Sequence, residues 1–449
     1  MAGEWQQSSI GAICDAGLAE LQTGPFGTQL HAYDYVENGI PIVPTEAIRG
    51  RRIDRTVLPK ITPAKANELK RHTLRLGDIL FARRGVQATG HIGCVREAED
   101  GFICGTGAIR LRLVDAGNTL DADYLSHVLA DPASIDWFKF HAIGATMPNL
   151  NEGIIRSFPL RIPPVAEQRA IAHILGTLDD KIELNRRMSE TLEAMARALF
   201  KSWFVDFDPV RAKAEGRDPG VTEALAMLFP DSFEDSELGE IPRGWEVGKL
   251  GDVAVHPRRI VQPEAIGPDV PYIALEHMPR RCISLADWDV ADGLESNKFE
   301  FRKGEILFGK LRPYFHKVGV APVDGVCSTD IVIVTPQEPI WFAFVLGLIS
   351  SDEFVAFTNS GSTGTKMPRT SWDDMARYEL VKPSRQLAEA FTDRLRPAVE
   401  RMIAGIHESR ALATLRDTLL PVLITGALRA PLQCDVDGKG LKSNAYQQK

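Results

Sequence analysis

Apolar residues follow two different periods along this chain, and these periods divide it into two kinds of segment. Residues 1–164 and 241–383 contain short runs of β-branched and other apolar residues, such as Ile40–Val43, separated by glycine and proline. Runs of this length predict strands joined by turns. Residues 165–204 instead repeat seam positions at alternating steps of four and three, and residues 384–425 do so at less regular steps of three and four. Both patterns predict long amphipathic helices.

The predicted helices each carry an apolar seam of coiled-coil type. The first seam consists of Ile171, Leu175, Leu178, Ile182, Asn185, Ser189, Leu192, Ala196, Leu199 and Trp203. The second consists of Phe391, Leu395, Ala398, Met402, Ile406, Ser409, Leu412, Leu415, Leu419 and Leu423. If the helices pair antiparallel through their middles, the polar residues Asn185 and Ser189 should face Gly405 and Ser409. Pro397 predicts an early bend in the second helix. A helix of 40 residues is about 60 Å long, which favours a spacer over a core helix of one domain.

The strand-rich part of the chain occurs twice, with the second copy starting about 220 to 240 residues after the first. The matching runs are PIVPTE (41–46) with PYIALE (271–276), LGDILF (76–81) with KGEILF (303–308), IGCV (92–95) with VGVA (318–321), and the Met-Pro pairs at 147 and 367. Each copy also contains one expected helix, over 122–141 and around 339–358, and Asp121 or Asp123 is a candidate cap for the first. The repeat is far longer than the ~20–50 residues of a solenoid unit, so it indicates a duplicated globular domain.

The predicted fold class is therefore α+β, with two duplicated mixed α/β domains separated by two long antiparallel coiled-coil helices. The expected order is domain 1 (1–164), spacer helix 1 (165–204), a linker with one short helical patch (205–240), domain 2 (241–383), spacer helix 2 (384–425) and a disordered tail (426–449).

Composition agrees with an ordinary globular protein and favours the cytoplasm. Hydrophobic residues make up 44% of the chain and charged residues 25%. No secretory leader is evident at the first residues, and the longest apolar stretch, 340–349, is too short to span a bilayer. We therefore expect no membrane association. The 6 cysteines include no Cys-x-x-Cys pair, so neither a zinc site nor a disulfide framework is expected.

The net charge of −8 is unusual for a protein that binds phosphate backbones, because such proteins generally present a basic face. Basic residues nevertheless cluster at five places. These are Arg49/Arg51/Arg52/Arg55, Lys70/Arg71/Arg75, Arg83/Arg84, Arg280/Arg281 and Lys310/Arg312/His316/Lys317. One such cluster alone is better explained as a solvated surface. Clusters at related places in both copies favour a nucleic-acid surface that is local or completed by a partner.

No catalytic motif is recognisable. Gly105-Thr106-Gly107 lacks the third glycine and the βαβ context of a dinucleotide fingerprint, and the spacing in 360–366 is not that of a phosphate loop. Paired carboxylates, His-Glu-x-x-His and Gly-x-Ser-x-Gly are also missing from the sequence. We expect no catalytic residue, no metal site and no enzymatic activity of this chain by itself.

Gly-rich or cation-bearing loops are the candidate DNA contacts in both copies. Arginine pairs well with guanine and Gln or Asn with adenine, whereas hydroxyls and lysine suit phosphates. An ordinary turn is the alternative for each loop taken alone. The candidate residues of the first copy are Thr23, Phe26, Thr28, Gln29, Arg83, Arg84, Thr146 and Asn149. Those of the second copy are Lys310, Arg312, Tyr314, Ser362, Thr363, Thr365 and Lys366.

Several runs together resemble the specificity (S) subunit of type I restriction–modification systems. They are TGPFG (23–27), PPVAEQRAI (163–171), LFKSWFVDFDPV (199–210), IPRGWEV (241–247), GEILFGKLRPY (304–314) and GTKMP (364–368). The run at 199–210 is the most distinctive, and the resemblance covers residues 1–425. One departure is the less regular second helix with Pro397, which makes the two spacers less alike than a clean duplication would.

The resemblance implies a role in defence against foreign DNA. Each domain would be a target-recognition domain that reads one half of a bipartite double-stranded DNA site. The helices would set the gap between the halves and dock two methyltransferase (modification) subunits, and restriction/translocase subunits would join them. S-adenosylmethionine, ATP and Mg2+ would belong to these partners and not to this chain. The alternatives left open are a structural adaptor without DNA sequence readout and a stand-alone enzyme.

Overall fold

The computed structural model describes residues 5–27, 29–114, 118–144, 146–362 and 367–430. The chain divides into two compact units. Unit 1 comprises Met1–Asp180 and Leu412–Lys449, and unit 2 comprises Lys181–Ala411. Each unit combines an α+β domain with one part of each long helix. We call the α+β domain of unit 1 the first domain and the α+β domain of unit 2 the second domain.

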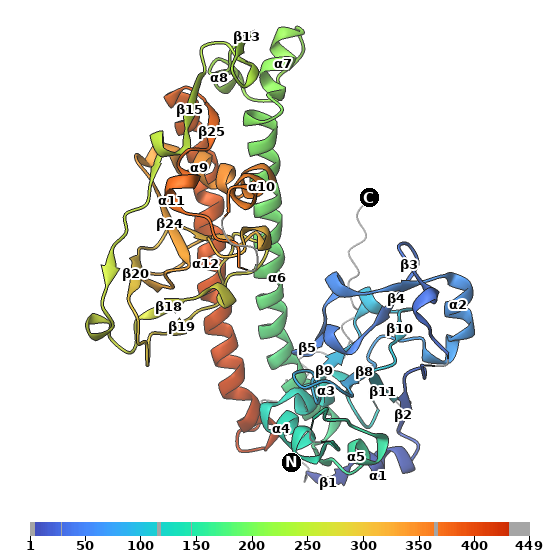
Figure 1. The fold of residues 1–449 in the computed structure, drawn as a ribbon. Coiled ribbons are helices and arrows are strands. Elements are labelled where there is room, and N and C mark those ends of the chain that lie inside the picture. Colours follow the sequence, from blue (N-terminus) through green and yellow to red (C-terminus); the bar gives the residue numbers. More distant parts are fainter. Residues whose placement is uncertain (1–4, 28, 115–117, 145, 363–366, 431–449) are drawn as a thin grey trace, which may run out of the picture. The chain divides into compact units, whose positions relative to one another are not determined.

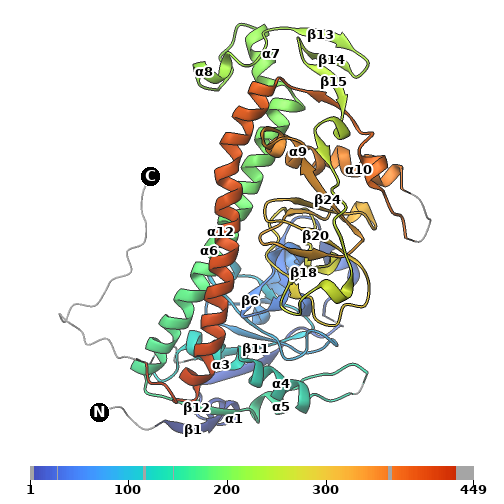
Figure 2. The same ribbon diagram turned by 90° about the vertical axis from the view of Figure 1, so that its left-hand side faces the viewer.

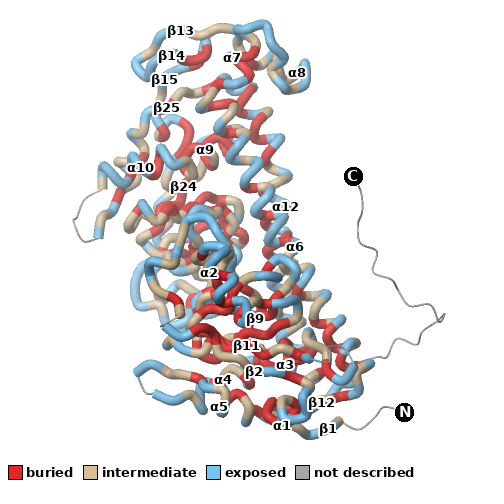
Figure 3. The backbone as a smooth tube through the Cα atoms, turned by 90° about the vertical axis from the view of Figure 1, so that its right-hand side faces the viewer, coloured by how far each residue is buried: buried red, intermediate tan, exposed pale blue. Residues whose placement is uncertain are grey.

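The first domain contains two four-stranded sheets. Its elements are β1 (Gln6–Ser9), α1 (Ile10–Asp15), β2 (Ala19–Thr23), β3 (Tyr35–Val36), β4 (Ile40–Val43), β5 (Ile48–Arg49), β6 (Arg52–Ile53), β7 (Lys60–Ile61), α2 (Pro63–Glu68), β8 (Ile79–Ala82), β9 (Ile92–Cys94), β10 (Ile103–Cys104), β11 (Ala108–Leu113), α3 (Ala122–Ala130), α4 (Pro132–His141), α5 (Glu152–Arg156) and β12 (Pro159–Ile162). One sheet has the order β2-β11-β8-β9 and the other β10-β4-β7-β3, with β10 and β4 parallel. Strands β8 and β9 are buried throughout, and Figure 3 shows β9 and β11 largely in red.

The second domain repeats the strand order of one of these sheets. Its elements are β15 (Glu246–Lys249), β16 (Ala254–Val255), β17 (Ile260–Val261), β18 (Pro271–Ile273), β19 (Asp289–Val290), β20 (Lys298–Phe301), β21 (Ile306–Gly309), β22 (Val318–Val320), β23 (Gly325–Cys327), β24 (Ile331–Pro336), α9 (Phe342–Ile349), α10 (Asp352–Ser360), α11 (Trp372–Met375) and β25 (Glu379–Lys382). The order β16-β24-β21-β22 matches β2-β11-β8-β9, and β18 pairs parallel to β23 as β4 does to β10. The other sheet of the second domain has five strands in the order β17-β20-β23-β18-β19. In the sheet β2-β11-β8-β9, Phe81 pairs with Ile92 and Ile109. In the sheet β16-β24-β21-β22, Phe308 pairs with Val318 and Val332. The duplication seen in the sequence is therefore a duplication of the fold.

The long helices are α6 (Val165–Phe204) and α12 (Arg385–Ile424). Within each unit they lie side by side and run in opposite directions (Figures 1 and 2). In unit 1, Arg416 Nη1 lies 2.8 Å from Asp179 Oδ1. In unit 2, Asn185 Nδ2 donates to Glu408 Oε2 at 2.9 Å and to Ser409 Oγ at 3.3 Å. The expected position of Asn185 opposite Gly405 and Ser409 is confirmed.

The seam prediction holds for all ten positions of α6, which are buried or half-buried. On α12 it is wrong at one position, because Leu415 is 47% exposed. Val399 and Ile403, which are not among the predicted seam positions, are also buried. The apolar face of α12 is therefore broader than a strict heptad stripe. The helix also continues through Pro397.

Two expected helices are each broken into two. In the first domain the break falls between α3 and α4, because Asp131 caps α4 by accepting from Ala133 N and Pro132 occupies the first turn. A proline ring cannot continue the preceding helix without losing a backbone hydrogen bond. In the second domain Ser351 caps α10 by accepting from Phe354 N, so the expected helix 339–358 ends at α9 and restarts.

The segment 205–240, expected to be a linker with one short helical patch, has that patch but also further elements. This segment contains α7 (Asp208–Ala214), α8 (Glu223–Ala226) and a hairpin of β13 (Phe233–Ser236) and β14 (Gly239–Pro242). Phe207, Val210 and Phe229 are buried in the same apolar cluster as the second domain and helix residues such as Trp203. The aromatic residues of this segment therefore fold it onto unit 2.

The expectation of a disordered tail over 426–449 is wrong for its first residues. Arg429 Nη1 pairs with Glu167 Oε2 at 2.9 Å, Trp5 Nε1 donates to the same oxygen at 3.1 Å, and Ala430 is buried. Residues 426–430 are thus folded into unit 1, and residues 431–449 lie outside the described residues. Along the described ranges no single helix is long and apolar enough to cross a membrane; the pair 339–349 and 352–360, bent by 70°, meets that test of length and composition only when joined.

Candidate nucleic-acid interface

The predicted loops meet at the same backbone corner in the two domains. In the first domain, Arg83 N donates to Gly107 O at 2.8 Å and Leu150 N donates to Arg83 O at 2.8 Å. In the second, Lys310 N donates to Asp330 O at 2.9 Å and Thr370 N donates to Lys310 O at 3.1 Å. Strands β8 and β21 both contain the Ile-Leu-Phe run, and the residue that follows each strand, Arg83 or Lys310, is cationic. These two cations therefore lie at equivalent positions in the two domains.

The neighbouring arginines of the first corner have different surroundings. Arg83 is half-buried, and its Nε donates to Asn149 Oδ1 and to Leu150 O, both at 3.1 Å. Arg84 is exposed, and among the described residues no hydrogen bond or ion pair of its side chain is found. The geometry gives Arg83 a part in holding the loop that contains Asn149, whereas the guanidinium of Arg84 is available to a ligand.

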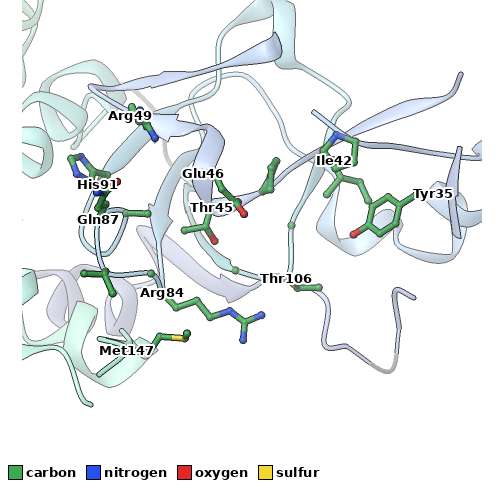
Figure 4. A pocket seen from close by; sticks show the side chains of 17 residues that line it. Tyr35, Ile42, Thr45, Glu46, Arg49, Arg84, Gln87, His91, Thr106 and Met147 are labelled. Atoms are coloured by element: carbon green, nitrogen blue, oxygen red, sulfur yellow. The ribbon is translucent and has the colours of Figure 1, made fainter. Parts of the chain in front are cut away.

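Arg84 lies at an open cleft of about 1080 Å³ in the first domain. Figure 4 shows Arg84, Thr45 and Thr106 around the same opening, with Tyr35 and His91 at its two sides. The remaining lining residues are Ile42, Pro44, Glu46, Arg49, Pro59, Gly85, Val86, Gln87, Ala88, Gly105, Gly107 and Met147. Guanidinium, amide and hydroxyl groups of this kind are those that contact base edges and phosphates.

Glycines shape the wall of this cleft. A Cβ atom at Gly107 would lie 1.9 Å from Thr45 Oγ1, and one at Gly105 would lie 2.3 Å from Val43 O. Both approaches are far shorter than van der Waals contact. The Gly-Thr-Gly run, which did not satisfy a dinucleotide fingerprint, is explained by this close packing of two backbone segments, and it leaves Thr106 at the opening.

The charge of the cleft is mixed and mainly basic. Arg49 and Arg84 contribute two guanidinium groups, and Glu46 contributes one carboxylate. Burial, and next the charge of Lys139, lower the pKa of His91, which favours its neutral ring. A surface with few net charges agrees with the modest net charge of the whole chain.

The other predicted residues of the first domain lie in two further loops. The backbone N and the Oγ1 of Thr23 both donate to Glu152 Oε1, at 3.1 and 2.8 Å, so the hydroxyl already has a partner within the first domain. Phe26 is exposed, and its N donates to Gln29 Oε1 at 3.0 Å. Thr146 is exposed beside Met147. Thr23 and Gln29 thus stabilise their own loops, while Phe26 and Thr146 are free to meet a partner.

In the second domain, the predicted residues surround one short turn. Lys310 precedes it, Arg312 has a left-handed backbone with φ of 51°, and Tyr314 is half exposed. The guanidinium carbon of Arg312 lies 5.9 Å from the centre of the Phe315 ring. Ser362 Oγ donates to Asn359 O at 2.7 Å at the end of α10. Thr28, Thr363, Thr365 and Lys366 lie outside the described residues.

Several residues at these places were missed in the choice of candidates from the sequence. Tyr35, Glu46 and Gln87 line the cleft but were not among the candidates. Glu46 and Gln87 lie close in sequence to the basic clusters at Arg49 and Arg83/Arg84, whereas Tyr35 has no such neighbour. Arg280 was part of a basic cluster, but its neighbour in space, Phe315, is 35 positions later (315 − 280) and carries no polar signal. In the described part of the chain, no three His, Cys, Asp or Glu side chains gather closely enough to hold a metal ion.

Comparison with known proteins agrees with this organisation. Residues 3–194 match the family model of the type I restriction modification DNA specificity domain. The chain is 27% identical over 367 residues to the type I restriction enzyme HindI specificity subunit of Haemophilus influenzae, covering 69% of this chain and 78% of that protein. It is 25% identical over 321 residues to the type I restriction enzyme MjaIX specificity subunit of Methanocaldococcus jannaschii, covering 69% of each.

A solved structure gives the same result for the fold. The S subunit of a type I restriction–modification system from M. genitalium superimposes with a TM-score of 0.54 at 16% identity, covering 94% of this chain and 96% of that one. The α+β fold class expected from the sequence and the resemblance on which it partly rested are both confirmed. The chain is therefore similar to the type I restriction enzyme specificity subunits over about two thirds of its length, and its residues 3–194 match the type I restriction modification DNA specificity domain.

Proposed function

We propose that this chain is the DNA-recognition subunit of a type I restriction–modification complex, and that each domain reads one half of a bipartite site. The observation that carries this proposal is the equivalent corner in the two domains, which places Arg83 and Lys310 at one backbone position. The residues around the corner differ between the domains. Arg84 forms an antiparallel backbone bridge with Asn149, and Leu311 forms the corresponding bridge with Arg369, so an arginine in the first domain corresponds to a leucine in the second. One scaffold with two different sets of side chains suits the reading of two different half-sites.

The two long helices are proposed to set the gap between the half-sites and to dock two methyltransferase subunits. Support for docking comes from unit 2, where Leu184, Met188 and Met195 are exposed on α6. Their spacing of four and seven residues places them on one face of the helix. An exposed apolar face on a helix whose seam is already paired favours contact with another protein.

The chemistry of the complex is proposed to belong to its other subunits. S-adenosylmethionine would be bound by the methyltransferase subunits, and ATP and Mg2+ by the restriction/translocase subunits. This chain would contribute recognition and assembly without catalysis, in the cytoplasm. Its net charge of −8 suits a DNA surface that is completed by basic residues of the partners.

Methylome sequencing tests the reading of two half-sites. A host that carries the complete system should show a bipartite methylated motif that disappears when this chain is deleted. Replacing residues 1–164 with those of a related subunit should change one half of the motif and leave the other half and the gap unaltered. A single continuous motif, or a methylome that is the same without the chain, would reject the proposal. Assembly without any sequence-dependent DNA binding would instead favour the structural adaptor.

Docking is tested separately from reading. Changing Leu184, Met188 and Met195 together to serine should prevent co-purification of the methyltransferase subunits, because the apolar contact area is removed. Met227→Ser is a suitable control, since Met227 is also an exposed methionine but lies beyond the helix. An intact complex with the triple variant would show that docking uses another surface.

A further inference from the structure

The second domain contains a strained turn at its predicted DNA-facing corner. Pro313, Tyr314 and Phe315 form one 3-10 turn between Arg312 and His316, which have left-handed φ values of 51° and 52°. Such a backbone is unfavourable for a residue other than glycine, and strain of this kind concentrates at functional sites. The turn presents Tyr314 and Phe315 in a fixed arrangement, with their ring centres 4.7 Å apart and edge to face.

Two arginines from distant parts of the sequence meet at Phe315. The guanidinium carbon of Arg280 lies 4.0 Å from the centre of the Phe315 ring, and that of Arg312 lies 5.9 Å from it. Arg280 is exposed, and within the described ranges no hydrogen bond or ion pair of its side chain is found. A guanidinium held against an aromatic ring keeps its N–H edges free and oriented.

A third cation adds to this surface. Lys317 Nζ donates to Leu275 O, and after burial the charge of Arg280 is the largest cause that lowers the pKa of Lys317. Glu276 is a nearby carboxylate and acts in the opposite direction. Arg280, Arg312 and Lys317 therefore form a locally basic surface on a chain with a net charge of −8.

The two segments that carry these cations are tied to each other and to the start of α10. Arg281 N donates to His316 O at 2.8 Å, and Arg281 Nη1 pairs with Asp352 Oδ1 at 2.7 Å. His316 Nε2 lies 3.0 Å from Ser350 O. Arg280 and Phe315 are thus each next to an anchored residue, which limits their freedom and lowers the entropy that a ligand contact must overcome.

We propose that Arg280, positioned by Phe315, reads a guanine edge in the major groove of the half-site that the second domain recognises. Arg312 and Lys317 contact the adjacent phosphates. Guanine N7 and O6 accept two parallel N–H groups, which is the geometry that a flat, fixed guanidinium offers. A phosphate contact requires only charge and does not explain the stacking. The inference rests on the proposed function, namely that the second domain binds double-stranded DNA.

The test measures DNA binding by the purified complex of the full chain with its methyltransferase partners. The probe is a duplex that carries the methylated motif of the host, compared with duplexes in which each guanine of the second half-site is replaced. Arg280→Ala should weaken binding to the motif about 5- to 150-fold and remove the preference for one guanine. Arg280→Lys should lose most of that preference too, because lysine cannot make the paired contact. Phe315→Leu should give a smaller loss of the same preference.

Arg211→Ala is the matched control. Arg211 is also an exposed arginine over an aromatic ring, 5.1 Å from the centre of Phe233, and it should leave binding unchanged. Wild-type behaviour of Arg280→Lys, with a lower salt dependence for Arg280→Ala, would show a phosphate contact and overturn guanine reading. Unchanged binding by Arg280→Ala, or a second half-site without guanine, would also overturn it. A wild-type complex without any sequence preference would instead reject the proposed function itself.

Discussion

Arg51 in the first domain and Arg281 in the second both have a left-handed backbone, with φ values of 64° and 54°, but their side chains have different surroundings. Arg51 is 5% exposed, and its Nη1 pairs with Asp179, which is 6% exposed on α6. Arg281 is exposed and pairs with the exposed Asp352 at the start of α10. The same backbone feature is therefore part of the interior of unit 1 and part of the surface of unit 2.

The comparison shows how a duplicated domain keeps its attachment while changing the groups that make it. In unit 2 the contact with α6 comes from the backbone, since Ile283 N donates to Glu193 Oε2 at 3.0 Å. Glu193 is buried and stands 14 residues after Asp179 (193 − 179), which is the same heptad position two heptads later. Each domain thus reaches a buried carboxylate of α6, through an arginine in one case and through a peptide N–H in the other. That change leaves Arg281 and its neighbour Arg280 free for the surface.

Substituting glycine in the two turns should give the largest contrast. Arg51→Gly removes one of the two arginines that pair with the buried Asp179, the other being Arg416. Breaking a buried pair costs about 3–5 kcal/mol and relief of left-handed strain returns about 1–2 kcal/mol, so we expect a net loss of about 2–3 kcal/mol in the free energy of unfolding. Arg281→Gly loses an exposed pair worth about 0–1 kcal/mol and relieves left-handed strain of about 1–2 kcal/mol, so it should remain within about 1–2 kcal/mol of the wild type. Chemical unfolding of the full chain, followed by circular dichroism, measures both.

Asp180→Ala is the control for this first contrast. Asp180 adjoins Asp179 on α6, but its pair with Arg96 is exposed, and its loss should cost at most about 1 kcal/mol. Equal losses for Arg51→Gly and Arg281→Gly would contradict the distinction between a buried and a surface role for the turn.

Acid should reveal a second difference. His72 in the first domain is buried, and neither of its ring nitrogens has a hydrogen-bond partner among the residues that the structure describes. Burial lowers the pKa of His72 to about 4. An unfolded histidine has a pKa of about 6.5, so between these values the unfolded chain binds more protons. This contribution to stability is present above pH 6.5 or so and is lost as the pH falls, by about 3 kcal/mol at pH 4. His72→Phe should remove that part of the pH dependence.

His316 in the second domain provides the comparison for the acid experiment. Burial lowers its pKa as well, but the hydrogen bond to Ser350 O acts in the opposite direction. His316→Phe should therefore change the pH dependence of unfolding less than His72→Phe does. If His72→Phe unfolds with the same pH profile as the wild type, His72 is not buried in its neutral form.

Gly107 tests the packing of the first cleft. Its counterpart at the second corner is Asp330, so a side chain is tolerated there and not here. Gly107→Ala forces Thr45 to move, and we expect a loss of about 1–3 kcal/mol. In a Thr45→Ala background the same substitution should cost clearly less, as measured by a double-mutant cycle. An equal cost in both backgrounds would show that the contact with Thr45 does not require the glycine.

The smallest expected effect concerns the seam of unit 2. The buried seam residue Asn185 of unit 2 is polar and contacts Gly405, Glu408 and Ser409, whereas the buried seam residue Leu175 of unit 1 is apolar. Asn185→Leu should change the free energy of unfolding by no more than about 1 kcal/mol in favour of the folded state, because a polar seam residue lowers stability while it specifies register. Thermal unfolding measures the change, and a large destabilisation would show that the amide contributes more than its apolar replacement.

Periodicity and repetition predict most of this fold, since both depend on local rules. The 4,3 spacing locates α6 and α12 because seam positions must be buried, and the repeated Ile-Leu-Phe run locates β8 and β21 because those strands are buried on both faces. The break between α3 and α4 is not predicted, because the apolar periodicity continues across it. Asp131-Pro132 is nevertheless a recognisable cap and first turn. The folding of 205–240 escapes prediction because Phe207 and Phe229 find their partners only in tertiary structure.

The candidate site is less accessible to prediction, because it depends on which side chains remain free. Arg83 and Arg84 are equal as a sequence pair, and only the approach of Asn149 and Leu150 shows that Arg83 is engaged while Arg84 is open. Similarly, nothing adjacent to Arg280 in the sequence indicates a stacking partner at Phe315. Whether any of these residues contacts DNA remains a prediction.

The return of α12 into unit 1 has a consequence for the order of synthesis. Leu420 and Leu423 are buried in the same apolar cluster as Ile171, Leu175 and Tyr124, and Arg416 completes the ion pairs of Asp179. The first domain therefore lacks part of its own interior until residues 412–424 have been translated. Unit 2, whose residues are contiguous, can close earlier. The nascent N-terminal domain should consequently depend more on chaperones than its position in the chain would suggest.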